Sequence, residues 1–149
     1  MTTETTFADV ASLVGTEIGV SEWLEIDQAR VNLFADATGD HQWIHVDVER
    51  ATKEIGGPIA HGYLTLSLIP YLSKDIMKVS GVTRGINYGL NKVRFTSMVP
   101  VGSKVRARQK LLAVEPKGPG LQMTSEVTIE IEGNPRPAAV AETLSVIYP

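Results

Sequence analysis

Asp40 and His45 are separated by four residues and could act together as an acid/base pair. A histidine side chain has an ordinary pKa of about 6.5, close to neutral pH. An ordinary aspartate, with a pKa of about 3.9, is a useful acid or base only if burial raises its pKa or a histidine shares its proton. Such a pair could take a proton from water and deliver one to carbon, which is what adding water to an activated double bond requires.

That reaction also needs a donor for the oxygen on which negative charge develops. When the double bond is conjugated to a carbonyl group, the charge collects on the carbonyl oxygen. The first N–H groups of a helix suit this role because they lack intrahelical acceptors and lie at the positive end of the helix dipole. Gly62 stands at the start of an apolar helical segment and has no side chain to obstruct the oxygen. We therefore expect its backbone N–H to form the oxyanion hole, a type of donor whose loss typically costs about 3 kcal/mol of barrier.

Helix-capping residues surround the Asp40/His45 pair. Asp27 is a predicted N-cap for a helix that ends at Gly39, and Asp47 is a predicted N-cap for a second short helix that ends at Gly56. Residues 40–46 are therefore expected to form a loop held between two capped helices.

The remaining periodicity predicts an α+β fold. Residues 17–26 alternate as a strand, and 63–79 are first apolar on nearly every side and then amphipathic, as expected of a buried helix. Pro70 should kink or break this helix because it lacks an N–H. Further strands are predicted at 86–95, 101–113, 121–131 and 138–148. Their short connections predict a mainly antiparallel sheet that wraps one central helix.

Charge and hydrophobicity together predict how two of these strands pair. One register places basic residues opposite acidic ones on the outer face and apolar residues opposite each other on the inner face. The predicted partners are Lys104 with Glu132, Arg106 with Glu130, Lys110 with Glu126, Val105 with Ile131 and Ala107 with Ile129. The basic stripe formed by Lys104, Arg106, Arg108 and Lys110 is therefore interpreted as a charge-paired, solvated face rather than a phosphate-binding site. The alternation slips near Asn91, which predicts a β-bulge there.

The segment from Phe34 to Asp47 resembles the hydratase signature of the MaoC-like, or R-specific enoyl-CoA hydratase (hydratase 2), family, and more narrowly its NodN-like branch. The shared residues are Gly39-Asp40, His45, Asp47 and the later Pro58-Ile59-Ala60-His61-Gly62. The resemblance implies one hot-dog domain over residues 1–149, with Asp40 and His45 catalytic and the Gly62 N–H as oxyanion donor. It implies the reversible dehydration of a (3R)-3-hydroxyacyl-CoA to a trans-2-enoyl-CoA. Many family members have Asn-Pro where this chain has Gln42-Trp43, a departure that bears on substrate range.

Other interpretations of these residues stay open at this point. A hot-dog acyl-CoA thioesterase and a non-catalytic acyl-thioester-binding subunit are the alternative functions. Gln42, Trp43, His61 and Tyr63 could line the substrate site, although the two aromatic side chains could belong to the core and His61 could bind backbone. His41 and Gln42 could join Asp40 and His45 around a metal, but no Glu or Cys completes the ligand set, so no metal is expected.

Composition narrows the kinds of site and partner that remain possible. With 149 residues the chain has the length of one domain, and without cysteine it has no thiolate nucleophile, disulfide or Cys-ligated metal. A net charge of −3 with mixed signs disfavours nucleic acid and anionic membranes as partners. No apolar run suggests a membrane span and the first residues do not resemble a secretory signal, so a cytoplasmic location is expected. The expected partners are an acyl-CoA or acyl-carrier thioester and a second copy of the chain, because exposed sheet edges favour a homodimer; no cofactor is expected.

Overall fold

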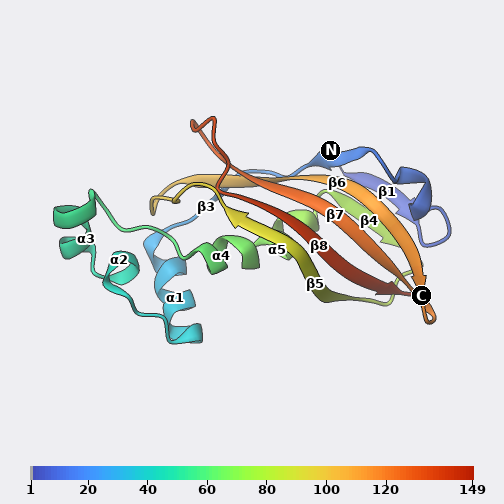
Figure 1. Ribbon diagram of the computed structural model, residues 1–149, viewed down its shortest axis with the longest axis horizontal. Coiled ribbons are helices and arrows are strands. Elements are labelled where there is room, and N and C mark those ends of the chain that lie inside the picture. Colours follow the sequence, from blue (N-terminus) through green and yellow to red (C-terminus); the bar gives the residue numbers. More distant parts are fainter. Residues whose placement is uncertain (1) are drawn as a thin grey trace.

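The computed structural model describes residues 2–149 (Figure 1). Its strands are β1 (Thr3–Thr6), β2 (Glu17–Val20), β3 (Leu24–Glu25), β4 (Met77–Ser80), β5 (Arg84–Phe95), β6 (Lys104–Lys117), β7 (Gly120–Ile131) and β8 (Ala139–Tyr148). Its helices are the 3-10 turn η1 (Val10–Leu13), α1 (Gln28–Thr38), α2 (Trp43–Val46), α3 (Val48–Ile55), α4 (Gly62–Ser67) and α5 (Ile69–Ser73).

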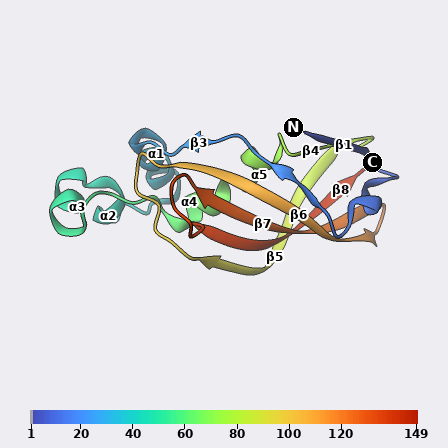
Figure 2. The same cartoon turned by 90° about the horizontal axis from the view of Figure 1, so that it is seen from above.

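The large sheet has the strand order β2-β6-β7-β8-β5, with β3 also paired to β6, and all of these pairs are antiparallel. Helices α4 and α5 run along one face of this sheet, while α1, α2 and α3 lie beyond one of its ends (Figures 1 and 2). Strands β1 and β4 form a separate parallel pair. The predicted α+β architecture, a mainly antiparallel sheet around a central helix, is confirmed.

The predicted pairing of β6 with β7 is also confirmed. Val105 is opposite Ile131, Arg106 opposite Glu130 and Lys110 opposite Glu126, as the alternating pattern predicts. Of the three expected charge pairs, Arg106 and Glu130 form an ion pair of 2.9 Å. Arg108 adds contacts to Glu17 and Glu130, and the hydrogen bond to Glu17 is the main reason that the Arg108 pKa is raised. The two arginines of the stripe are thus paired with carboxylates, whereas Lys104 and Lys110 form no ion pair within the described residues.

The pairing of β5 with β8 contains the expected irregularity. The register shifts between Leu90 and Lys92, which confirms a bulge at Asn91, and shifts once more between Asn87 and Gly89. The hairpin between β6 and β7 is tighter than the sequence suggested. Lys117 pairs with Gly120, so only residues 118 and 119 form the turn.

The predicted helix over 63–79 is wrong in its extent. The helix breaks at Leu68, where α4 ends and α5 begins, and Pro70 lies in the first turn of α5, where its missing N–H costs no intrahelical bond. The expected break is therefore present, slightly before the proline. The helix then ends at Ser73, and Met77–Ser80 form β4, because β1 offers a parallel partner to residues that the local pattern could not distinguish from helix.

Residues 17–26 form two strands rather than one. The interruption falls at residues 21–23, where the buried Ser21 hydroxyl accepts a hydrogen bond from the Ala107 N–H and donates to the Glu22 carbonyl. In the gap between β2 and β3, the Ser21 side chain thus replaces part of the backbone hydrogen bonding to β6.

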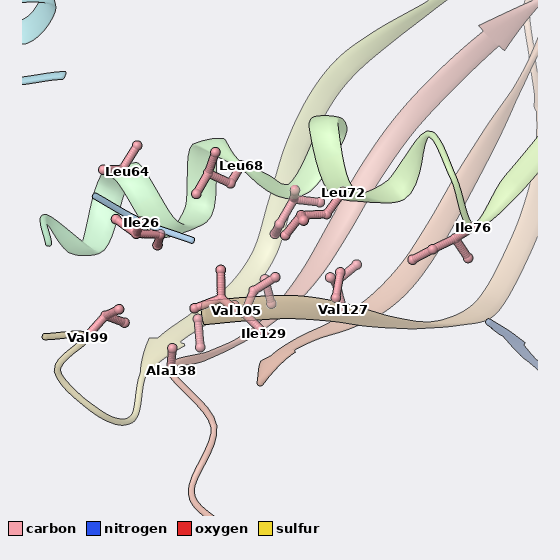
Figure 3. Packing of buried hydrophobic residues seen from close by; sticks show 14 of the residues in the cluster. Ile26, Leu64, Leu68, Leu72, Ile76, Val99, Val105, Val127, Ile129 and Ala138 are labelled. Carbon is pink, nitrogen blue, oxygen red and sulfur yellow. The ribbon is translucent and has the colours of Figure 1, made fainter. Parts of the chain in front are cut away.

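The core lies between the α4–α5 segment and the inner face of the sheet (Figure 3). Leu64, Leu68, Leu72 and Ile76 recur every four residues and are all buried, as are their partners on the strands, which include Val105, Val127 and Ile129. Burying one such side chain stabilises the fold by about 1.5–3 kcal/mol. Among residues 2–149, no helix has the length and apolarity needed to cross a membrane.

Candidate active site

Asp40 is positioned by the end of α1. Gly39 takes the left-handed conformation at φ 81° and its N–H bonds the Ala35 carbonyl, so the chain turns away from the helix immediately before Asp40. The Asp40 side chain is exposed, and its Oδ1 atom accepts a hydrogen bond of 3.3 Å from the Gln42 N–H. The predicted caps Asp27, Gly39, Asp47 and Gly56 are all confirmed.

His45 lies in the one-turn helix α2, so the expectation that residues 40–46 are wholly a loop is wrong. The side chain is buried, with 6% of its surface exposed. Its Nδ1–H donates to the Ile59 carbonyl at 2.6 Å, since a carbonyl oxygen can only accept. In the neutral ring this leaves the Nε2 lone pair free to accept a proton. The Gln28 side-chain amide also donates to the His45 carbonyl at 2.8 Å, which ties α2 to α1.

His61 is the N-cap of α4 and is almost fully buried. Its Nε2–H donates to the Asp40 backbone carbonyl at 3.0 Å, and its ring stacks on that of His45 at a centroid distance of 3.8 Å. The sequence left open whether His61 lines the site or binds backbone, and in the structure it bonds the backbone of Asp40. Its Nδ1 atom has no hydrogen-bond partner among the described residues.

Three side chains from different elements meet here. A carboxylate oxygen of Asp40 and ring nitrogens of His45 and His61 all lie within 4.8 Å of one another. Two imidazoles and a carboxylate could also ligate a transition metal, although not the set with His41 and Gln42 that the sequence suggested. The acid/base interpretation uses the same atoms without a metal, and the absence of a metal stays a prediction.

Gly62, the residue after His61, is the first residue of α4. At this position the backbone N–H has no acceptor within the helix. The ring of Phe95 lies against the glycine, and a Cβ atom added at Gly62 would stand 3.1 Å from it. A side chain here would therefore displace Phe95 as well as narrow the approach to the N–H.

The other predicted site residues are more peripheral. Gln42 is exposed and caps α2 without a side-chain bond, and the half-buried Trp43 stacks under the Arg50 guanidinium at 4.1 Å. Tyr63 is 69% exposed and meets Phe95 edge to face. His41 is exposed and bonds Asp36 at 2.9 Å, which raises its pKa.

Sequence reasoning missed a cavity of about 910 Å³ between the central helix and the sheet. It begins at Leu66 and Ser67, one helical turn past Gly62, and its walls include Gln109 and Ser125. A signal was present in the sequence, because Gln109 interrupts the apolar odd positions between Val105 and Ala113. The roles of Gln28 and of the Ile59 carbonyl were also missed, and a backbone carbonyl leaves no signal in the sequence.

Comparison with known proteins gives concordant matches. The family model described as "MaoC like domain" matches residues 9–132. The chain is 53% identical over 146 residues to 3-hydroxyacyl-thioester dehydratase Z of Mycobacterium tuberculosis, covering 97% of both chains. It is 49% identical to nodulation protein N of Rhizobium leguminosarum, covering 97% of this chain and 92% of that one. The solved (R)-hydratase from A. caviae involved in PHA biosynthesis is 25% identical with a TM-score of 0.71, covering 89% of this chain and 96% of that one.

Proposed function

The chain belongs to the family of MaoC-like domains and has the hot-dog fold, and on this premise we propose that it interconverts (3R)-3-hydroxyacyl and trans-2-enoyl thioesters. It is a hydro-lyase of hydroxyacyl thioesters, as its full-length relative named as a dehydratase indicates. The R configuration and coenzyme A as the carrier are the finer parts of the proposal. The relative named as an (R)-hydratase supports the first of them.

The observation that carries the mechanism is the meeting of Asp40 with a His45 ring whose tautomer is set by the Ile59 carbonyl. In the hydration direction, the free Nε2 of His45 accepts a proton from water as the water oxygen bonds to C3. Asp40 holds the same water and shares the proton, because its carboxylate lies beside the ring. A general acid/base of this kind typically contributes 10²–10⁴-fold to the rate.

The electron pair of the C2–C3 double bond then moves toward the thioester carbonyl. Negative charge builds on that oxygen, and the Gly62 N–H stabilises it by donating a hydrogen bond. C2 takes the proton from the dyad, so that one water molecule has been added and the dyad is restored. Dehydration is the reverse, in which the dyad removes the C2 proton and returns one to the departing hydroxyl. No cofactor takes part in this scheme.

The test is hydration of crotonyl-CoA, followed as loss of the enoyl absorbance. The wild type should turn it over, and Asp40→Asn and His45→Gln should each lose about 10²–10⁴-fold in kcat. His41→Gln, a change at a neighbouring exposed histidine whose side chain bonds Asp36, is the matched control and should retain activity. In a separate assay, the wild type should release no free thiol from a saturated acyl-CoA. Full activity in both dyad variants, or thiol release, would contradict the proposal.

We also propose that two copies associate along β5. This strand is the last in the order of the large sheet, so within residues 2–149 one of its edges has no partner. It exposes large apolar side chains, with Ile86 47%, Tyr88 53% and Leu90 44% exposed. A long apolar edge is a template for pairing with another chain. Light scattering should give twice the chain mass, and a monomer mass would contradict this part.

A further inference from the structure

The cavity lies along the central helix, one turn beyond Gly62, and the residues that line it do not include those of the proposed reaction centre. One wall is formed by α4 and α5 and the other by the inner face of β5 to β8, with Ile69, Met123 and Val127 among its apolar residues. A helix rises about 1.5 Å per residue, so the cavity starts about 6 Å from Gly62 at Leu66 and extends to about 16 Å at Ser73. Its length and apolar walls suit an acyl chain attached to the reacting thioester.

Polar side chains cross the inner sheet face in the middle of this apolar cavity. Gln109 on β6, Ser125 on β7 and Thr143 on β8 all line it. Ser125 and Thr143 are direct partners in the β7–β8 register, and the Gln109 Nε2 donates to the Ser125 Oγ at 3.1 Å. Gln109 and Ser125 are buried, with 8% and 3% of their surfaces exposed. They are therefore built into the core rather than placed at its rim.

The hydrogen bonding in this group is incomplete. Among the described residues, the buried Gln109 Oε1 accepts no hydrogen bond, and the buried Ser73 Oγ, on the helix side of the cavity, has no partner. The Ser125 Oγ accepts from Gln109, so its O–H remains available as a donor. The cavity thus offers both an acceptor and hydroxyl donors to a molecule that enters it.

A plain alkyl chain cannot form hydrogen bonds with these groups. Buried polar groups in proteins are almost always hydrogen-bonded, to protein or to ordered water. An alkyl chain would displace such water and leave Gln109 and Ser73 unpaired, which reduces affinity. A hydroxyl on the chain can donate to the Gln109 Oε1 and accept from a serine, so it satisfies both sides.

We propose that this cavity is a subsite for an acyl chain bearing a hydroxyl group remote from the thioester, so that the preferred substrate is a hydroxylated enoyl or hydroxyacyl thioester. The inference rests on the proposed hydratase function and names a substrate class for the same site. The cavity begins about 6 Å along the helix from Gly62, so we expect the four-carbon crotonyl group to stay outside the subsite and its hydration to be independent of Gln109.

The test compares crotonyl-CoA, trans-2-decenoyl-CoA and a set of trans-2-decenoyl-CoA isomers with a hydroxyl at successive positions of the distal half of the chain. For the wild type, kcat/KM should be about tenfold higher for the best hydroxylated isomer than for the plain chain, as one net hydrogen bond predicts. In Gln109→Met, which keeps the length but loses both polar atoms, this ratio should fall to about one or below, mostly through KM. Crotonyl-CoA turnover should be unchanged.

Crotonyl-CoA turnover also reports whether each variant folds. If Gln109→Met loses it, Ser125→Ala takes its place, because it removes one hydroxyl from the same group. A wild type that prefers the plain chain to every hydroxylated isomer would overturn the inference, as would a preference that survives in the folded variant. Failure of the proposed hydratase function would give a different result, because the wild type would then not hydrate crotonyl-CoA.

Discussion

The lobe formed by α1, α2 and α3 and the body formed by the sheet with α4 and α5 are held together in different ways. The body buries a continuous set of apolar side chains between helix and strands, whereas the lobe extends beyond the end of the sheet (Figure 1). Within the lobe, Val31, Ala35, His45 and Ala51 are buried. Much of its order comes from helix caps and from the Gln28 bond to the His45 carbonyl.

The proposed active site lies where these two regions meet. Asp40 and His45 come from the lobe, while His61 and Gly62 begin the central helix of the body. Hydrogen bonds cross this boundary from His45 to the Ile59 carbonyl, from the Ile59 N–H to the Ile44 carbonyl, and from His61 to the Asp40 carbonyl. The comparison indicates that the body supplies stability, while the lobe brings polar groups to the first turn of the central helix.

The largest expected difference in stability is between apolar residues of the two regions. Leu72→Ala should lower the free energy of unfolding by about 3 kcal/mol, because it leaves a cavity against the sheet. Leu33→Ala in the lobe is the matched control: Leu33 is 68% exposed, and the change should stay within about 0.5 kcal/mol. Urea unfolding measures both. Equal losses would mean that Leu33 is packed as tightly as Leu72, which would contradict its exposed position.

At the boundary, His61 is expected to act as a positioning residue. His61→Leu removes the donor to the Asp40 carbonyl, so kcat for crotonyl-CoA should fall by about 10- to 100-fold with little change in KM. His61→Gln, which keeps an N–H donor of similar reach, should recover part of that loss. If the two variants have the same kcat, the hydrogen bond does not position Asp40.

Within the lobe, the caps should contribute measurable but smaller stability. Asp27→Ala removes the acceptor for the Arg30 N–H and should destabilise the protein by about 1 kcal/mol. Asp27→Asn, which keeps a capping oxygen, should lose much less. Thermal unfolding of the three proteins checks this, and an unchanged midpoint in Asp27→Ala would show that α1 does not depend on its cap.

The smallest effect is expected at His41, and it should depend on pH. The hydrogen bond to Asp36 raises the pKa of His41 above its ordinary value of 6.5. The stabilisation is therefore fully present below pH 6.5, while Asp36 is ionised, and is lost as the pH rises through the raised pKa. Unfolding of wild type and His41→Gln at a series of pH values should show a small difference on the acid side that disappears on the alkaline side. A difference that grows with pH would contradict this assignment.

The sequence predicted those features that depend on near neighbours or on repeated patterns. The caps at Asp27, Gly39, Asp47 and Gly56 involve contacts within a few residues, and the β6–β7 register follows from charge and hydrophobicity along both strands. Residues 77–79 were wrongly assigned to the helix, because pairing with β1, more than seventy residues away, decides that 77–80 form a strand. The tautomer of His45 was equally inaccessible, since it depends on a backbone carbonyl.

The most direct test of the central claim, that Asp40 and His45 act as one unit, is a double-mutant cycle in kcat/KM for crotonyl-CoA. Asp40→Asn and His45→Gln should each cost about 10²–10⁴-fold, and the double variant should lose little more than the worse single variant. Unfolding midpoints of all four proteins show whether the fold is retained. Losses that multiply in the double variant would mean that the two side chains act independently, and would contradict the dyad.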